Sequence, residues 1–170
     1  MSPDQLPLHI DPYRYAENRR QLAGELSLAA LPRLLDATAD PERSLDGRVA
    51  VMIECSIDNE GYHTLQGVAR CQVALTCQRC LEPVNYPLEA EFSLALVRNS
   101  EAAAALPSHY EPLLVEGKVI TLAEMVEDEL LLALPMIARH QSACLALPQE
   151  AADAGKKEHP FAQLQRLKEL

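Results

Sequence analysis

Hydrophobic and polar residues alternate along three successive stretches in the middle of the chain, residues 49–57, 62–76 and 84–97. A period of two is typical of β-strands that turn one face to a core and the other to solvent. The first two stretches are separated by residues 58–61, whose Asp, Asn and Gly residues favour a turn. We therefore predict three antiparallel strands joined by tight turns, with a bulge at Gly67 in the second strand.

The N-terminal third carries weaker signals. Asp11 followed by Pro12 predicts a helix start, with an N-cap and a proline in the first turn, and the helix would run to Arg20. Apolar residues at even spacing over 21–28 predict a brief strand. The polar segment 36–47 is expected to be a loop.

A second helix is predicted after the three strands. Thr121 and Glu124 have the spacing of a capping box, in which both side chains accept hydrogen bonds from backbone amides at the helix start. The helix is expected to end at Leu134, because Pro135 cannot continue it. The preceding segment, 101–117, shows no clear periodicity and is interpreted as an irregular excursion.

A sheet with one apolar face must close on itself or be covered by helices. The sequence therefore predicts an α+β fold, an antiparallel β meander or part-barrel with flanking helices. We expect a single domain over 1–148, followed over 149–170 by a flexible linker and a short amphipathic helix that contains Phe161 and Leu164. That helix would dock on the domain or bind a partner.

Charge indicates the kind of partner. Fifteen Lys and Arg oppose 25 Asp and Glu, giving a net charge of −10, and broad binding to phosphate backbones needs dense positive charge. A basic partner is favoured, although acidity can also serve solubility alone. Glu124, Glu127 and Asp128 are expected to project from the second helix as its docking surface, or only to complement the helix dipole. The clusters that can contact RNA directly are expected to be secondary, and they comprise Arg14, Arg19, Arg20, Lys156, Lys157, Arg166 and Lys168.

The five cysteines are an odd number, and the first fifteen residues are polar and contain prolines. No apolar run approaches the length that spans a membrane. These features favour a cytoplasmic protein with no membrane partner. Cys55 and Cys71 fall on the inward phase of their strands and are interpreted as core residues.

Cys77 and Cys80 form a CxxC motif at the end of the second strand. Two thiols at this spacing can ligate a soft metal ion, close a redox disulfide, or simply pack in a turn. His140 and Cys144 would complete the Cys₃His set that tetrahedral zinc accepts, in a protein large enough to fold without the metal. A thiol enzyme is less favoured, because its CxxC normally lies at a helix N-terminus, whereas this pair joins two strands.

Four segments together resemble the YceD family, the large ribosomal RNA subunit accumulation proteins. The resemblance covers nearly the whole chain, and the matching segments are residues 75–81, 110–112, 125–135 and 159–164. It implies a small bacterial non-catalytic factor needed for accumulation of the large-subunit (23S) ribosomal RNA. Some members carry a full second cysteine cluster after the helix, and at the matching place this chain has His140 and Cys144.

Three functional hypotheses follow. The first is a ribosome-biogenesis factor that binds a large-subunit ribosomal protein or pre-ribosomal RNA–protein particle, and the second is an acidic chaperone for one basic ribosomal protein. The third, and the alternative class, is a zinc- or thiol-dependent redox or adaptor protein that uses Cys77 and Cys80. The sequence favours a non-catalytic protein and leaves the first two open, because protecting a basic ribosomal protein would also change ribosomal RNA levels.

Overall fold

The computed structural model describes residues 6–44 and 46–144. The chain divides into two compact units, 1–140 and 141–170. The described part of the second unit, residues 141–144, contains no helix or strand. The predicted boundary at residue 148 and the predicted C-terminal helix lie outside the described residues and stay predictions.

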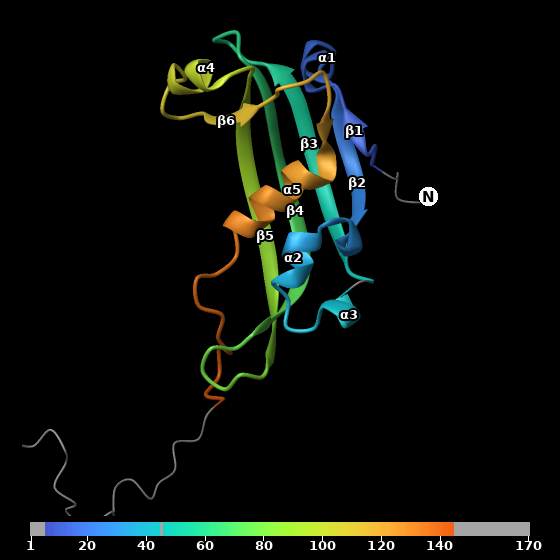
Figure 1. The fold of residues 1–170 in the computed structure, drawn as a ribbon, viewed down its shortest axis with the longest axis vertical. Helices are drawn as coiled ribbons and strands as arrows, with labels where there is room; N and C mark the ends of the chain where they lie inside the picture. The colour runs from blue at the N-terminus through green and yellow to red at the C-terminus, as the bar shows by residue number, and fades with distance from the viewer. Residues whose placement is uncertain (1–5, 45, 145–170) are drawn as a thin grey trace, which may run out of the picture. The chain divides into compact units, whose positions relative to one another are not determined.

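The first unit is built on a five-stranded sheet with the order β2-β3-β4-β5-β6 (Figure 1). Strands β2 to β5 form an antiparallel meander, and β6 pairs with β5 in parallel. Its strands are β2 (Gln21–Ser27), β3 (Arg48–Ile57), β4 (His63–Thr76), β5 (Pro83–Val97) and β6 (Glu111–Leu114). A separate antiparallel pair joins β1 (His9–Ile10) to β7 (Ile120–Thr121). The predicted α+β class is confirmed in its meander form, since the sheet is open and does not close into a barrel.

Helices precede and follow the central strands β3 to β5 in the sequence. They are α1 (Pro12–Glu17), the 3₁₀ turn η1 (Leu28–Ala30), α2 (Pro32–Asp36), α3 (Pro41–Ser44), α4 (Ser100–Ala104) and α5 (Leu122–Leu132). Figure 1 shows α5 and α2 lying across the same face of the sheet. In the part of the chain that the structure describes, no helix has the length and apolar character needed to cross a membrane.

The core lies between this sheet face and α5. Inward strand residues such as Ile53 and Leu65 are fully buried, and so are Leu122, Val126 and Leu130 of α5. Burial of each large apolar side chain stabilises the fold by about 1.5–3 kcal/mol. The predicted placement of the helix on the apolar face of the sheet is therefore confirmed.

Cys55 and Cys71 belong to this core, as predicted. Burial raises the pKa of each thiol to about 11. Both side chains therefore stay neutral at physiological pH and act as small hydrophobic residues.

The predicted bulge at Gly67 is wrong. Ile53, Gly67 and Phe92 lie directly opposite one another in three adjacent strands, within uninterrupted registers. A Cβ atom at position 67 would lie 2.7 Å from Cζ of Phe92 and 2.5 Å from the carbonyl oxygen of Met52. Glycine is needed here because the Phe92 ring approaches the backbone closely.

The two predicted helix starts are correct in position, but only one has the predicted cap. Asp11 caps α1 by accepting a hydrogen bond from the Arg14 backbone N–H at 3.1 Å. Thr121 is the N-cap residue of α5 but makes no side-chain cap hydrogen bond. The N–H of Leu122, the first helical residue, donates to the carbonyl oxygen of Leu8 at 3.0 Å, so a tertiary contact satisfies one amide of the first turn.

Other element boundaries differ from the predictions. Helix α1 ends at Glu17 and α5 at Leu132, each shorter than expected, and the expected loop 36–47 contains the short helix α3. The segment 101–117 is more ordered than its composition indicated. It supplies most of α4 and all of β6, and pairing with β5 gives β6 a hydrogen-bonded position at the sheet edge.

Candidate metal centre

The CxxC motif occupies the turn between β4 and β5, as predicted. The Cys77 N–H donates to the Glu82 carbonyl oxygen at 2.9 Å, and the Leu81 N–H donates to the Cys77 carbonyl oxygen at 2.8 Å. Leu81 adopts a left-handed conformation with φ 65°. These features close a compact turn that carries both thiols.

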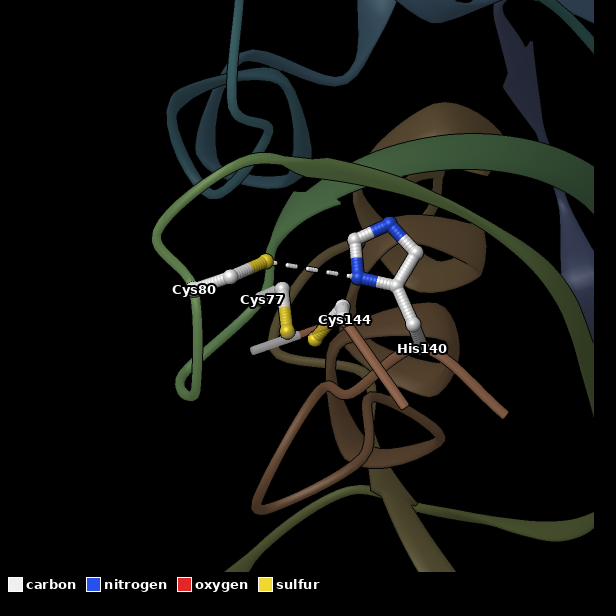
Figure 2. Close-up of side chains that lie close together, drawn as sticks. All are labelled: Cys77, Cys80, His140 and Cys144. Atoms are coloured by element: carbon white, nitrogen blue, oxygen red, sulfur yellow. Dashed lines mark hydrogen bonds between the residues drawn. The ribbon is translucent and has the colours of Figure 1, made fainter. Parts of the chain in front are cut away.

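The segment after α5 is tied to this turn by its backbone. The Gln78 N–H donates to the Ala138 carbonyl oxygen at 2.9 Å, and Nη2 of Arg79 donates to the His140 carbonyl oxygen at 3.3 Å. Helix α5 ends before Pro135, and the chain then runs toward the β4–β5 turn (Figure 1). His140 thereby reaches a cysteine that lies 60 residues away in sequence, with Nδ1 at 3.5 Å from Sγ of Cys80 (Figure 2).

The predicted ligand set comes together in the structure. The ligand atoms of Cys77, Cys80, His140 and Cys144 all lie within 4.8 Å of one another, and Figure 2 shows the four side chains. A tetrahedral zinc ion with ordinary bond lengths would place such atoms about 3.5–3.8 Å apart. Closure of roughly 1 Å would therefore form a complete shell, so the residues fit a structural Cys₃His zinc site.

The electrostatics of Cys77 suit a ligand. Burial by itself would raise the pKa of this thiol. Hydrogen bonds from the backbone N–H groups of Arg79 and Cys80, and from His140, outweigh that effect and lower the pKa to about 5. The thiolate is the form that binds metal, in contrast to the core cysteines described above.

The predicted acidic docking surface on α5 is only partly present. Glu124 is exposed in the first turn of the helix. Glu127 is 2% exposed, so the expectation that it projects into solvent is wrong. Asp128 is exposed but forms an ion pair with Arg33, with Oδ1 at 2.7 Å from Nη2. The helical spacing indicates the reason, because Glu127 shares a face with the buried residues Ala123 and Leu130.

Of the predicted basic residues, the three in the described part of the chain lie in and just after α1. Arg14 is part of the helix, Arg19 follows it with a φ of 48°, and Arg20 directly precedes β2. The remaining predicted contact residues lie outside the described residues, namely Lys156, Lys157, Phe161, Leu164, Arg166 and Lys168. Sequence reasoning did not single out Arg98 and Lys118, which line one pocket with Arg14, because nothing local links these distant positions.

Comparison with known proteins assigns the chain to a family. A family model described as "Large ribosomal RNA subunit accumulation protein YceD" matches residues 65–168. The protein of that name from Haemophilus influenzae is 34% identical over 173 residues, which is 97% of this chain and 97% of the relative. The chain belongs to the YceD family. No solved structure gives a significant match.

The region matched by the YceD model starts in β4 and includes the CxxC turn and α5. The H. influenzae relative extends the similarity over nearly the whole chain, including α1 and β2. The predicted family is therefore confirmed.

Proposed function

We propose that this protein is needed for accumulation of the large-subunit ribosomal RNA and that it acts by binding and not by catalysis. The observation that carries the proposal is the 34% identity, over 97% of both chains, to a protein named for that process. A relative similar along its full length shares the overall fold and not only one motif.

The state of the CxxC motif supports a binding role over a thiol-redox role. Cys77 is fully buried, so a substrate disulfide has no direct approach to its sulfur. The motif also lies between two strands, where no helix N-terminus is present to assist a nucleophilic thiolate. The Cys₃His group is better suited to a structural zinc ion, which would link the β4–β5 turn to the segment after α5.

We propose that the direct partner is a component of the large subunit, either a ribosomal protein or a pre-ribosomal RNA–protein particle. The net charge of −10 supports attraction of a cationic protein. Glu25, Glu54 and Glu91 are exposed on the sheet face opposite the core, and Glu124 is exposed on α5.

Gene deletion with complementation tests the proposal. Loss of the gene should lower the ratio of large-subunit to small-subunit ribosomal RNA, and a plasmid copy of the full chain should restore it. An unchanged ratio in the deletion strain would show that the protein has another role. Affinity purification of the full chain, with and without ribonuclease treatment, then separates a protein partner from one held through RNA.

The redox alternative is tested by a Cys80→Ser variant, with zinc content measured in parallel. Under the binding proposal, any loss of complementation should follow loss of zinc and fold. Loss of complementation in a variant that keeps both zinc and stability would instead favour thiol chemistry at Cys80.

A further inference from the structure

The surface around α1 carries a concentration of positive charge. One pocket, of about 530 Å³, is lined by Arg14, Arg98 and Lys118 beside Tyr13. A second pocket, of about 560 Å³, shares Arg14 and adds Arg20. We call the surface formed by Arg14, Arg20, Arg98 and Lys118 the basic pocket. Its residues lie in α1, directly before β2, directly after β5 and in the loop before β7, so only the fold brings them together.

Aromatic rings hold two of these guanidinium groups in place. The Cζ atom of Arg98 lies 4.8 Å from the centroid of the Tyr13 ring, and that ring makes an edge contact with His63 at 5.1 Å between centroids. The Cζ atom of Arg20 lies 5.9 Å from the Tyr15 ring centroid. Cation–π contacts of this kind restrict long side chains before any ligand arrives, which lowers the entropy cost of binding.

The cations of the basic pocket are available to a ligand. Among the described residues, none of the four has a carboxylate oxygen within the 4.0 Å of an ion pair. By contrast, Arg33 and Arg70 both form such pairs. Two carboxylates line the pockets, and one of them, Asp11, already accepts the hydrogen bond of the Arg14 backbone N–H. Four cations thus oppose two carboxylates on a protein whose net charge is −10.

We propose that the basic pocket binds the phosphodiester backbone of RNA. The inference rests on the proposed function, which places ribosomal RNA near the protein. Guanidinium groups bind phosphate oxygens through paired hydrogen bonds, and arginine next to aromatic rings is typical of surfaces that bind single-stranded RNA. The acidic remainder of the surface repels phosphate, so it directs an RNA strand to this end of the sheet. Arg14 and Arg20, which the sequence led us to expect only as secondary RNA contacts, thereby become principal ones, together with Arg98 and Lys118.

The test measures binding of an end-labelled single-stranded RNA to the purified full chain by fluorescence anisotropy at low salt. Arg14→Glu and Lys118→Glu should each weaken binding about tenfold and reduce the dependence of log K on log salt by about 0.7 for each lost phosphate contact. Arg48→Glu is the matched control. Arg48 is exposed and pairs with Ser27 at the end of β2 that is far from Arg20, and its reversal makes the same change in net charge. It should change binding less than twofold.

Circular dichroism of each variant separates lost binding from lost folding, and the milder Arg14→Gln should weaken binding if Arg14→Glu does not fold. The inference is overturned if the wild-type chain does not bind the RNA, or if Arg48→Glu weakens binding as much as Arg14→Glu. Failure of the proposed function has a different signature, an unchanged ribosomal RNA ratio in the deletion strain. If Arg14→Glu loses RNA affinity but complements fully, the pocket binds RNA in vitro and the proposed role of that contact in the cell is wrong.

Discussion

Glu127 of α5 caps another helix, α2, by accepting hydrogen bonds from Arg33, which lies 94 residues away in sequence. Oε1 of Glu127 accepts hydrogen bonds from the backbone N–H groups of Arg33 at 2.6 Å and Leu34 at 3.1 Å. Its Oε2 accepts a hydrogen bond from Nε of Arg33 at 2.8 Å. These N–H groups lie in the first turn of α2, whose N-cap residue, Leu31, has no side-chain acceptor. A carboxylate from α5 therefore supplies the acceptor that α2 lacks.

Replacement of Glu127 should be costly. Glu127→Ala would leave the buried N–H of Leu34 and the partly buried N–H of Arg33 without this acceptor, and we expect the free energy of unfolding to fall by about 3 kcal/mol. Urea denaturation followed by circular dichroism measures this loss. Glu124→Ala, on the exposed side of the same helix, is the control and should stay within about 0.5 kcal/mol of wild type. Equal effects of the two substitutions would contradict the capping role.

This result also changes how the acidic surface of α5 is tested. Reversing the charge of Glu127 would damage the fold, so partner binding must be probed through Glu124 and Asp128. Under the predicted attraction of a basic partner, reversal of both should reduce capture of the partner in an affinity purification. Loss of the Asp128–Arg33 ion pair should lower the free energy of unfolding only slightly, because ion pairs on the surface contribute little to stability. Full capture by this variant would remove α5 from the binding surface.

Zinc should bind once per chain. Elemental analysis of protein purified without a chelator or a metal-binding tag is expected to give one equivalent, and Cys80→Ser should reduce it. Removing the metal with a chelator should lower the melting temperature but leave the strand signal in circular dichroism, because the core does not depend on the ion. A content well below one zinc per chain after zinc loading would leave the cysteines as turn packing.

The contact between Asp58 and Tyr110 should make stability depend on pH. Although desolvation opposes it, the Tyr110 hydroxyl and backbone N–H groups of the 58–62 turn donate to Asp58 and lower its pKa. A lowered pKa in the folded state stabilises the protein above the unfolded value of about 4, and this contribution is lost as pH falls through the folded value. The same hydrogen bond raises the pKa of Tyr110 to about 12, so its contribution is lost as pH rises from about 10 to above 12.

Thermal unfolding of Tyr110→Phe against wild type checks this dependence. The variant should melt at a lower temperature near neutral pH, and the difference should shrink below about pH 4, where the carboxyl group becomes protonated. A difference that stays constant down to about pH 2 would show that the hydroxyl acts through something other than Asp58.

Gly67→Ala should destabilise the sheet. The new methyl group would overlap the Phe92 ring and the Met52 carbonyl oxygen, and we expect a loss of about 2 kcal/mol or more in the free energy of unfolding. Gly117→Ala is the control, since the nearest atom to its added Cβ lies 4.0 Å away. Denaturant unfolding of both variants makes the comparison, and an undisturbed Gly67→Ala protein would mean that the ring moves aside freely.

The sequence by itself determined the central strands, the position of the CxxC turn and the place of α5. These features depend on local rules, because alternation with a period of two defines a strand with one buried face, and a thiol pair between two such runs must lie in their turn. It also grouped His140 and Cys144 with Cys77 and Cys80 as a candidate Cys₃His set, and the structure brings these four side chains together. Resemblance over four segments indicated the family.

Only the tertiary structure decided what Glu127, Gly67 and the basic pocket do. The sequence makes Glu127 one of several acids on a helix, and only the fold brings its carboxylate into hydrogen bonds with the N–H groups of α2. Gly67 looked like a bulge because glycine has more than one use in a strand, and only the position of the Phe92 ring distinguishes them. Arg98 and Lys118 meet Arg14 at one pocket although they lie far from it in sequence. In each case the deciding partner is remote in sequence, and local patterns carry no information about which remote groups meet.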